Sequence, residues 1–568
     1  MRRPASTDPD RQSPLKLTLD LSNLRRKLRS TASFDEGRLG AFEAKGVIQD
    51  SIHGFIPINA GEYWLLQTPF LRRLHGIKQL GMAYLVFPSA RHSRLEHSLG
   101  VMHLASLIAN KVVHLARKDP RLHSALFTRE GAEPEEALVQ VARLAGLLHD
   151  IGHLAYSHMT EEAVKDLARF SEGDAASREL FGELSFLGAG TLKVHEAYTQ
   201  AFIEMLIRTA SESLAGGPLA ELPQFLEAAR ASLVRAPSSK GGVGDLQELG
   251  LRAEALRLIH DIVSNEIADA DRLDYLQRDA QATGIVYGQI DADRLVHGIT
   301  VEVSDDEPVL SLDIKSMQTL EDIFDARYKM YRSVYFHHKV IAFTKAVSAF
   351  IRSVAGEWAT NLMPLYGGQS LYQVLMPSRL ARAIIEDRYY LDDSELDYMI
   401  KVYAAVGKSS RRWALSLLER RDLLPISIVK RSEELIIMAE EVLRSHGVGE
   451  TPDNIAGLLR LVVNRLTEIE DSVRTMFGDG VRLDGFVGEV ISPEKMNRGG
   501  IKVFGWRESL YLRGLAEEGK IPVLLIYAYS DDERTHACVL RGRVDELRRR
   551  ARDEIRRVME DSVQQLRG

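Results

Sequence analysis

An apolar segment that ends in a cluster of polar residues constrains this chain more than any other feature. Residues 144–158 read Leu-Ala-Gly-Leu-Leu-His-Asp-Ile-Gly-His-Leu-Ala-Tyr-Ser-His. The apolar run predicts a buried helix that delivers His149 and Asp150 side by side, with His153 one helical turn later and His158 just beyond. Two adjacent polar groups in a core must be desolvated and then satisfied. Imidazole nitrogen and carboxylate oxygen together suit a divalent metal with positions open for water and phosphate, so the segment predicts a metal site.

The size and composition of the chain narrow its class. At 568 residues it exceeds one hydrophobic core, so two or more domains are expected. A formal net charge of −7 argues against a general nucleic-acid coat protein and leaves a local basic pocket open. The single cysteine, Cys538, excludes an intrachain disulfide or a cysteine-based zinc site. The N-terminal residues lack the apolar region of a secretory signal and no membrane-spanning run is expected, so a cytoplasmic location is predicted.

The apolar periodicity predicts a mainly α fold, with an all-helical catalytic core, a small β-hairpin and a C-terminal α+β lobe. We expect four regions along the chain. They are a mobile basic tail (1–35), the catalytic core (36–355), a helical extension (356–475) and the C-terminal lobe (476–568). Within the core, apolar residues recur three and four apart and predict helices in 101–116, 138–149, 196–208 and 251–276.

Shorter patterns complete this prediction. Alternating residues at 299–303 and 308–314 predict the β-hairpin. Residues 372–475 read as further helices, and 481–490, 521–529 and 535–541 read as strands. The charged segment 543–565 predicts an amphipathic helix whose arginines form a solvated face.

Two distant segments complete the pattern around residues 144–158. Residues 92–100 read His-Ser-Arg-Leu-Glu-His-Ser-Leu-Gly, and residues 267–279 read Ile-Ala-Asp-Ala-Asp-Arg-Leu-Asp-Tyr-Leu-Gln-Arg-Asp. A histidine, then adjacent His-Asp, then a distant aspartate resembles the HD superfamily of metal phosphohydrolases. The resemblance implies that the metal ligands are His97, His149, Asp150 and Asp271.

Further motifs narrow the resemblance from the HD superfamily to one family within it. Residues 47–54 read Val-Ile-Gln-Asp-Ser-Ile-His-Gly, and residues 67–69 read Gln-Thr-Pro. Residues 73–81 read Arg-Leu-His-Gly-Ile-Lys-Gln-Leu-Gly, and residues 87–88 read Phe-Pro. In this order they resemble the deoxynucleoside triphosphate triphosphohydrolases, above all the branch whose vertebrate members carry a sterile-alpha-motif domain before the HD domain. The similarity is dense over 45–160 and 255–340, and no sterile-alpha-motif domain is expected here.

The resemblance implies a reaction and the residues that perform it. In this family water attacks the α-phosphorus of a deoxynucleoside triphosphate (dNTP), and deoxynucleoside and tripolyphosphate are released. One to two divalent ions (Mn, Mg, Fe or Zn) are expected, and Asp271 is also a candidate to orient the nucleophile. His158 is the first candidate for the acid that protonates the leaving oxygen, with His153 as its rival. The match adds a supporting network of His195, Glu196 and the acidic Glu161.

The same match implies contacts to the substrate. A triphosphate needs cationic groups, and the residues that match family phosphate contacts are Arg94, Arg272, Tyr275 and Arg327. Position 272 is commonly Lys in the family, so phosphate spacing is expected to differ slightly here. Gln79 and Asp279 match residues that bond the sugar 3′-hydroxyl. Tyr335, with Leu80, matches a wall packed under the sugar where a 2′-hydroxyl would clash. His92 and His103 have no such match and read as structural.

Regulation is where the sequence departs from the family. The vertebrate relatives are activated by guanine nucleotides bound between subunits, and an Asp and an Arg read the guanine. Gln67 and His75 stand at those positions here, so the charged pairing is lost. Candidate regulatory residues are therefore Val47, Gln67, His75, Asp291 and Arg294, the last two matching a deoxynucleotide regulatory site. We expect a homo-oligomer, a dimer or tetramer, with dNTPs as substrate and candidate activator.

Two other functions remain open at this point. One is an HD phosphohydrolase that cuts another nucleotide, such as a signalling nucleotide, or single-stranded nucleic acid. The residues at the 3′-hydroxyl argue against a polymer, because a chain continuing past that oxygen would collide there. The other is a nucleotide-sensing defence regulator. Intact metal ligands and intact acid candidates argue against a pocket kept only for sensing.

Overall fold

The computed structural model describes residues 44–170, 175–188, 194–233, 246–265, 269–304, 307–358, 361–419, 424–488, 501–503, 521–532 and 535–563. The basic tail predicted at 1–35 lies outside these residues.

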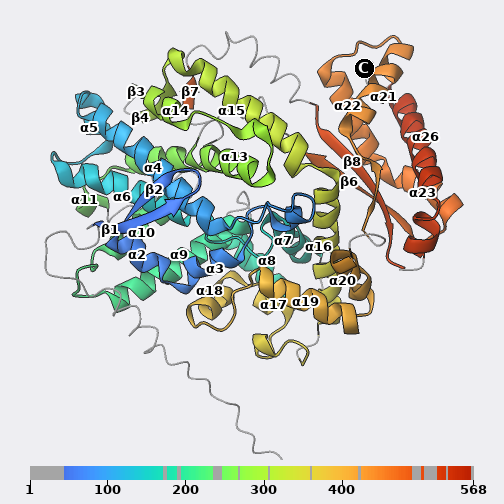
Figure 1. Ribbon diagram of the computed structural model, residues 1–568, viewed down its shortest axis with the longest axis horizontal. Helices are drawn as coiled ribbons and strands as arrows, with labels where there is room; N and C mark the ends of the chain where they lie inside the picture. Colours follow the sequence, from blue (N-terminus) through green and yellow to red (C-terminus); the bar gives the residue numbers. More distant parts are fainter. Residues whose placement is uncertain are drawn as a thin grey trace, which may run out of the picture.

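The prediction of a mainly α fold is confirmed. A large helical body fills most of Figure 1, and its longest helices share one hydrophobic core. These are α4 (Arg94–Ala116), α6 (Ala132–Leu148), α7 (His158–Phe170), α9 (Val194–Ser213), α10 (Leu222–Ser232), α12 (Ala253–Val263), α13 (Ala270–Thr283), α15 (Met317–Met330) and α16 (His338–Glu357). Shorter helices surround them, namely α2 (Ala60–Leu66), α3 (Pro69–Arg73), α5 (Pro120–Leu126), α8 (Ala175–Gly188), α11 (Leu246–Leu249) and α14 (Ala292–Gly298).

Helix α4 is the centre of this body, and its start is fixed locally. Ser93 caps the helix by accepting a hydrogen bond from the Glu96 backbone, while the Glu96 side chain accepts one from the Ser93 backbone. Helix α4 packs on α6 and α13. At the crossing with α6, a Cβ on Gly146 would lie 3.0 Å from the Met102 Cα, so glycine allows the two backbones to approach. The N-terminal turns of α4 thereby face the end of α6, where His149 stands.

Helix α4 also has the length and apolar character of a membrane span, with a mean hydropathy of 1.4 over its most apolar window. Of that window, 67% is buried inside the protein. Length and apolar character are shared by membrane spans and by core helices of globular proteins. The contacts of α4 with α6 and α13 are those of a core helix.

Small sheets flank the helices. The predicted hairpin is confirmed as β3 (Ile299–Ser304) and β4 (Glu307–Leu312), and β7 (Ile501–Val503) joins β4 in parallel. A second hairpin, β1 (Ala44–Asp50) and β2 (Gly54–Asn59), lies in a region that the sequence predicted as mostly helical. Its tight turn carries Asp50 and His53 toward α13, as described below.

After α16 the chain adds a helical layer and then a second core. Helices α17 (Leu371–Val374), α18 (Pro377–Ile385), α19 (Asp393–Val406) and α20 (Ser409–Glu419) pack into the first core, which reaches Leu424. The second core begins at Ile426 and contains β5 (Ile426–Val429), α21 (Ser432–Ser445), α22 (Pro452–Asn464), α23 (Leu466–Phe477), β6 (Val481–Gly488), β8 (Val523–Ser530) and α26 (Val544–Ser562). The hydrophobic cores thus divide the region that the sequence treats as one extension, 356–475.

Two local predictions in the second core are wrong. Strand β5, whose residues are all buried, interrupts the predicted helices and pairs antiparallel with β8. The strand predicted at 535–541 is instead a π-helical turn, Thr535–Leu540. A short apolar run suits a buried strand or a buried helix equally well. Here the buried His536 selects the helical turn, because its Nε2 lies 3.0 Å from the Leu424 carbonyl oxygen.

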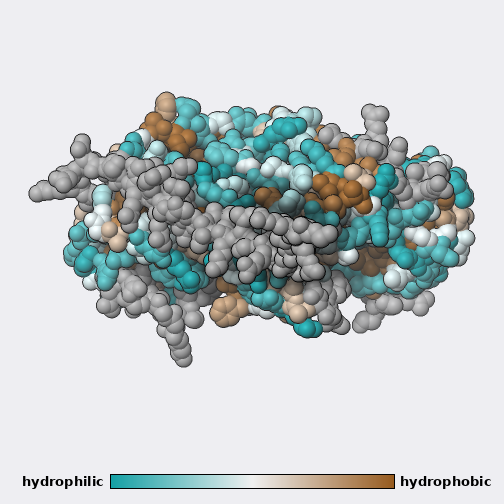
Figure 2. All heavy atoms as spheres, turned by 90° about the horizontal axis from the view of Figure 1, so that it is seen from below, coloured by the Kyte–Doolittle hydropathy of each residue, from teal (hydrophilic) through white to brown (hydrophobic). Residues whose placement is uncertain are grey.

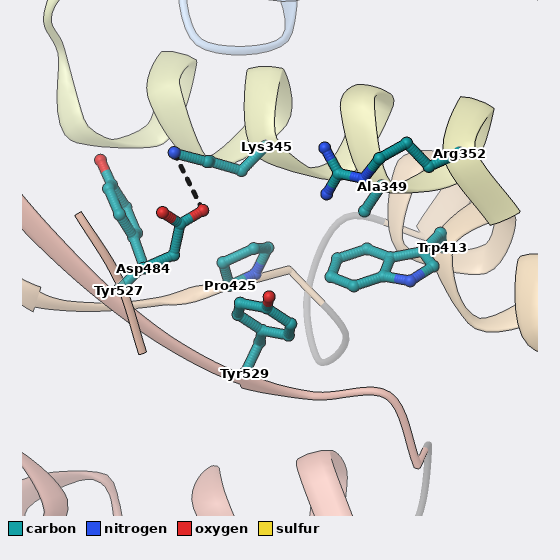
Figure 3. Close-up of a pocket in the computed structure, with 8 residues that line it drawn as sticks. All are labelled: Lys345, Ala349, Arg352, Trp413, Pro425, Asp484, Tyr527 and Tyr529. Atoms are coloured by element: carbon teal, nitrogen blue, oxygen red, sulfur yellow. Dashed lines mark ion pairs between the residues drawn. The ribbon is translucent and has the colours of Figure 1, made fainter. Parts of the chain in front are cut away.

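The second core rests against α16. Lys345 of α16 forms an ion pair of 2.9 Å with Asp484 of β6, and the Tyr527 hydroxyl donates to the His338 carbonyl at 2.9 Å. Figure 3 shows these side chains with Trp413 and Tyr529 around a small pocket at the junction. The arginines of α26 are paired as a solvated face would have them, for instance Arg556 with Glu441 at 2.8 Å. The described part of the face in Figure 2 is mostly hydrophilic, with apolar side chains in small separate patches.

Candidate functional site

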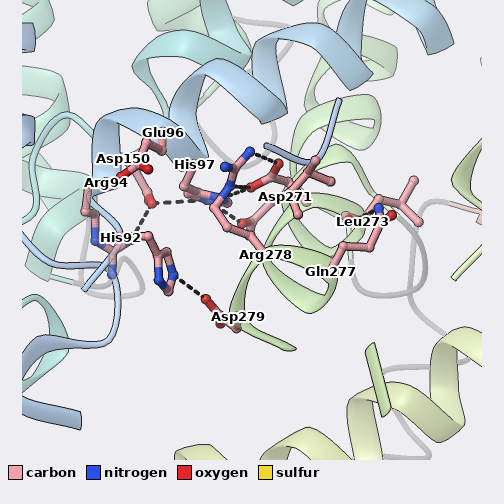
Figure 4. Close-up of polar contacts among 12 residues, drawn as sticks. His92, Arg94, Glu96, His97, Asp150, Asp271, Leu273, Gln277, Arg278 and Asp279 are labelled. Carbon is pink, nitrogen blue, oxygen red and sulfur yellow. Dashed lines mark hydrogen bonds and ion pairs between the residues drawn. The ribbon is translucent and has the colours of Figure 1, made fainter. Parts of the chain in front are cut away.

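The proposed metal ligands come together from three helices. His97 lies on α4, His149 and Asp150 follow α6, and Asp271 lies in the first turn of α13. The His97 Nε2 is 3.1 Å from Asp271 Oδ1 and 3.5 Å from Asp150 Oδ2. The His149 Nε2 is 3.4 Å from Asp150 Oδ1 and 3.7 Å from Asp271 Oδ1. Figure 4 shows His97 between the two aspartates. Both imidazole Nε2 atoms therefore point into one cluster of carboxylate oxygens.

The second nitrogen of each imidazole, Nδ1, lies at hydrogen-bond distance from an oxygen on the side away from the cluster. The His149 Nδ1 lies 2.8 Å from the Gly146 carbonyl oxygen, and the His97 Nδ1 lies 2.7 Å from Asp274 Oδ2. A carboxylate or carbonyl behind the ring fixes the tautomer that turns Nε2 toward a metal. Both Nε2 atoms are buried, and both face the carboxylate oxygens of Asp150 and Asp271. A divalent cation would satisfy both atoms, so the residues present fit a metal.

The charges of the cluster agree with that fit. Burial would raise the pKa of the Asp150 carboxyl, but His149 and Arg94 hold it well below its usual range. Burial likewise opposes the ionisation of Asp271, and His149 and His97 hold its pKa well below the usual range. Burial lowers the pKa of His97, yet hydrogen bonds from Asp271 and Asp274 raise it to about 10. Without a metal, protons on the imidazoles balance the two carboxylates, and a cation would take their place.

The carboxylate behind His97, that of Asp274, is absent from the residues predicted from the sequence. Asp274 is fully buried, accepts two hydrogen bonds from Arg278 and lies 2.7 Å from His53 Nε2. Arg278 in turn donates to Asp50, at 2.9 Å. A Cβ on Gly100 would stand 1.8 Å from Asp274 Oδ1, so only glycine leaves room for this carboxylate against α4. Asp274 stands one helical turn after Asp271, and that spacing was an available signal.

The histidines proposed as proton donors surround one glutamate. Glu161 Oε1 lies 2.6 Å from His153 Nδ1, and its Oε2 lies 3.0 Å from His195 Nδ1 and 3.4 Å from His158 Nδ1. Burial would raise the pKa of Glu161, but the imidazoles, led by His195, hold it well below its usual range. The structure thus brings together the predicted residues His153, His158, Glu161 and His195. Glu196 is half-buried in the first turn of α9, next to His195.

The two acid candidates occupy different surroundings. The side chain of His153 is 1% exposed and bridges the clusters, with its Nε2 3.2 Å from Asp150 Oδ1. The side chain of His158 is 66% exposed. Ligand atoms of His153, His158, Glu161 and His195 lie within 4.8 Å of one another, close enough to hold an ion themselves.

The residues predicted to bond the sugar gather at the far end of α13. Asp279 is buried, and its Oδ2 accepts a hydrogen bond of 2.7 Å from the Tyr335 hydroxyl. Its Oδ1 lies 2.7 Å from the Nε2 of His92, a histidine that the sequence left as structural. Tyr335 ends a π-helical turn (Tyr331–Tyr335), a feature frequent at functional sites. The Oε1 of Gln79 is buried and has no hydrogen-bond partner among the described residues, and Leu80 packs beside it against the core.

The predicted phosphate contacts come from three helices, α4, α13 and α15. Arg94 donates to Asp150, to the Ser157 hydroxyl at 2.9 Å and to the Gln79 carbonyl at 3.4 Å. Arg272 is paired with the buried Asp269. The Arg327 guanidinium lies 5.4 Å from the centre of the Tyr331 ring. The Tyr275 ring stands 6.1 Å from the Tyr335 ring, and burial raises the pKa of both phenols.

The candidate regulatory residues do not form one cluster within the chain. Val47 is 61% exposed on β1, Gln67 follows α2, and His75 is exposed after α3. Asp291 caps α14 and accepts a hydrogen bond from the Arg294 backbone, at 2.9 Å. Among the described residues, no hydrogen bond or ion pair joins the first three to this pair.

With the geometry described, comparison with known proteins defines the class. Residues 94–217 match the family model of the HD domain, which spans α4 to the end of α9. The predicted resemblance is confirmed over these residues, which form an HD domain.

Its relatives come from all domains of life. The human deoxynucleoside triphosphate triphosphohydrolase SAMHD1 is 30% identical over 311 residues, which are 54% of this chain and 44% of the relative. An uncharacterised protein of Methanocaldococcus jannaschii is 29% identical over 309 residues, 54% of this chain and 50% of the relative. The chain thus spans about half the length of the curated relatives it matches. A crystal structure of a phosphohydrolase from Bacteroides thetaiotaomicron shares the fold, with a TM-score of 0.52 and 19% identity over 86% of this chain and 100% of that chain.

Proposed function

We propose that this protein hydrolyses deoxynucleoside triphosphates to deoxynucleoside and tripolyphosphate with a divalent metal. One observation carries the proposal. Asp271 of the metal cluster and Asp279, which is bonded to His92 and Tyr335, lie on the same helix, α13 (Figure 4). A metal site suited to phosphate and a buried carboxylate suited to a sugar hydroxyl are thereby joined by one rigid element. The name of the human relative, a dNTP triphosphohydrolase, supports the same substrate class.

The chemistry of the first step follows from the cluster. A divalent metal held by His97, His149, Asp150 and Asp271 would supply a Lewis acid and an activated water at the α-phosphorus. Arg94 holds Asp150 from one side and directs its remaining donors toward the phosphates. Arg272, Arg327 and Tyr275 bind the outer phosphates, which carry most of the negative charge. Asp269 keeps the Arg272 guanidinium oriented in the absence of substrate.

The leaving 5′ oxygen receives its proton from His158. Its accessible ring can reach a bound substrate, whereas His153 is enclosed between Asp150 and Glu161. The negative charge of a bound triphosphate raises the pKa of a nearby imidazole and so favours the acid form of His158. Glu161 orients His158 and His195 through its Oε2, and the stacked His153 and His195 rings, 4.1 Å apart, complete the support.

Selection of the deoxyribose rests on three side chains. The 3′-hydroxyl donates its one hydrogen to the Asp279 carboxylate, and its oxygen accepts a hydrogen bond from the Gln79 side-chain amide. Tyr335 is fixed by its bond to Asp279 and stands where a 2′-hydroxyl would collide. The buried hydrogen bond strengthens the discrimination between deoxyribose and ribose, because the Tyr335 ring cannot move aside for a 2′-hydroxyl without breaking that bond.

We also propose that the enzyme is a homo-oligomer regulated by dNTPs. Exposed Val47 and Phe55, on the hairpin β1–β2, provide apolar surface for a second copy, and Asp291 with Arg294 is the candidate nucleotide contact. Light scattering with and without mixed dNTPs tests this part on its own. A mass that stays that of one chain under all conditions would refute it.

The activity test uses the purified protein with each dNTP and each NTP, singly and mixed, in the presence of Mg²⁺, Mn²⁺ or Co²⁺. Chromatography should detect deoxynucleoside and tripolyphosphate from dNTPs. The His149→Ala variant should lose both metal and turnover. The matched control His114→Ala removes an imidazole at the far end of α4 and should retain both.

Other products would point to other functions. Nucleoside monophosphate with diphosphate, or turnover of a signalling nucleotide alone, would replace the proposed reaction with another HD phosphohydrolase activity. Tight dNTP binding without any turnover in the metal-loaded protein would favour a nucleotide-sensing regulator.

A further inference from the structure

A backbone turn in an unfavourable conformation separates the two candidate proton donors. Tyr156 and Ser157 lie between His153 and His158 and have φ values of +54° and +55°. Residues other than glycine rarely adopt this left-handed region, because the Cβ approaches the carbonyl oxygen. Two such residues in succession persist only where the surrounding structure holds them. The question is which contacts hold this turn.

The main contact comes from outside the matched HD domain. Asp393, the first residue of α19, is 2% exposed. Its Oδ1 accepts a hydrogen bond of 2.7 Å from the Tyr156 backbone N–H. Its Oδ2 accepts from the Lys78 backbone N–H at 3.1 Å and from the Lys78 Nζ at 3.0 Å. One buried carboxylate therefore ties the turn to the segment that contains Gln79.

Two further contacts from the same region support it. The Tyr156 hydroxyl donates to Asp397, one helical turn after Asp393 in α19. The Ala155 backbone N–H donates to the Leu391 carbonyl oxygen at 3.0 Å, just before the helix begins. Leu391 and the first turns of α19 thus hold the backbone at the start of the turn and the hydroxyl of Tyr156.

The other face of the turn contacts the proposed catalytic groups. The Ser157 hydroxyl accepts a hydrogen bond from Arg94 Nε at 2.9 Å and donates to the Lys78 carbonyl at 2.9 Å. Arg94 also pairs with the metal-ligand candidate Asp150. His158 follows directly as the first residue of α7. If the turn relaxes, Ser157 moves away from Arg94 and His158 changes its direction.

We propose that Asp393 is a positioning residue that holds the 156–157 turn so that Arg94 and His158 face the substrate. Its effect on turnover rests on the proposed function, whereas its effect on the turn does not. Asp393 itself does not touch the substrate, and it acts through Tyr156 and Ser157. The helix α19 thereby becomes part of the active-site scaffold.

The test is the Asp393→Asn variant of the full chain. Its amide oxygen can accept from Tyr156 or from Lys78, and its NH₂ group then faces the other donor, so one of the two ties is lost. We expect kcat on the best dNTP to fall by about tenfold or more, with KM within about threefold and unchanged metal content, since small misplacements of catalytic groups mainly slow the chemical step. Unchanged kcat in a folded variant would overturn the proposal.

The matched control is Asp392→Ala. Asp392 caps α19 by accepting from the Ser394 and Glu395 backbones, and within the described part of the chain it makes no hydrogen bond to Tyr156 or Ser157. Its loss should lower Tm while kcat stays within about twofold of wild type, as expected for a helix cap. If both variants lose kcat equally, Asp393 is only structural and the proposal fails.

A second variant covers the case in which Asp393→Asn does not fold. Ser157→Ala removes the hydroxyl that joins the turn to Arg94 and should reduce kcat by a similar factor. Where both variants fold, the double variant should lose little more than the larger single loss, because the two residues act in series. Additive losses, or a Ser157→Ala variant with wild-type kcat, would contradict the proposed route.

A readout independent of dNTP turnover separates the two proposals. Hydrogen exchange of residues 154–158 should accelerate in Asp393→Asn and not in Asp392→Ala. If wild type hydrolyses no dNTP but this pattern appears, the proposed function fails and the holding of the turn stands. If exchange is the same in both variants, the role of Asp393 in the turn is refuted.

Discussion

Asp274 offers the sharpest test of the metal site, because it touches a proposed ligand without being one. Its Oδ2 lies 2.7 Å from the His97 Nδ1, and its other contacts are His53 and Arg278. In Asp274→Asn the amide oxygen still fits, but the negative charge that strengthens the imidazole as a ligand is removed. Loss of such a supporting carboxylate weakens metal binding by about 10- to 100-fold. That factor corresponds to roughly 1.4–2.8 kcal/mol of binding free energy.

The assay is equilibrium dialysis of the purified protein against Mn²⁺, with bound metal measured by mass spectrometry. The matched control is Asp50→Asn, which removes the other carboxylate of Arg278 without contacting His97. We expect the control to bind Mn²⁺ within about threefold of wild type, since it leaves the carboxylate behind the ligand in place. Wild-type affinity in Asp274→Asn, or an equal loss in both variants, would refute the reasoning.

Three further predictions test other parts of the structure. Tyr335→Ala removes the ring fixed 2.7 Å from Asp279, so the preference for dNTP over NTP in kcat/KM should fall by about tenfold or more. Gly100→Ala places a Cβ 1.8 Å from an Asp274 oxygen, and denaturant titration should show an unfolding free energy lower by about 3 kcal/mol. Burial and then Arg412 lower the pKa of His536 to about 3, below its unfolded value near 6.5. Its contribution to stability is therefore complete above about pH 6.5 and is lost as pH falls toward 3, by about 2 kcal/mol at pH 5. Thermal unfolding from pH 7 to 5 measures it, and His536→Asn should flatten the profile.

Much of the site could be predicted because its residues lie in short, patterned segments. His149 and Asp150 stand at the end of an apolar run, and Asp271 and Asp279 share one helix. The residues that support them were harder to find. His92 reads as an ordinary loop histidine, and only the fold brings its ring 2.7 Å from Asp279, 187 residues later.

Errors in the fold have a related cause. The hairpin β1–β2 and strand β5 lie in regions predicted as mostly helical, and the π-helical turn at Thr535–Leu540 reads as a strand. Short apolar segments carry too few residues to distinguish a period of two from one of 3.6. Their conformation is decided by what they pack against, as His536 shows through its contact with the Leu424 carbonyl.

The sequence by itself indicated the class of chemistry, because the adjacent His149 and Asp150, together with His97 and Asp271 in separate segments, resemble the HD phosphohydrolases. It also determined the main helices, because their apolar stripes repeat with the helical period. Only the tertiary structure decided how the ligands are held and aimed. Asp274 meets His97 across 177 residues, and Asp393 meets Tyr156 across 237. Such contacts depend on how helices pack, down to the missing Cβ of Gly100, and no local pattern in the chain records them.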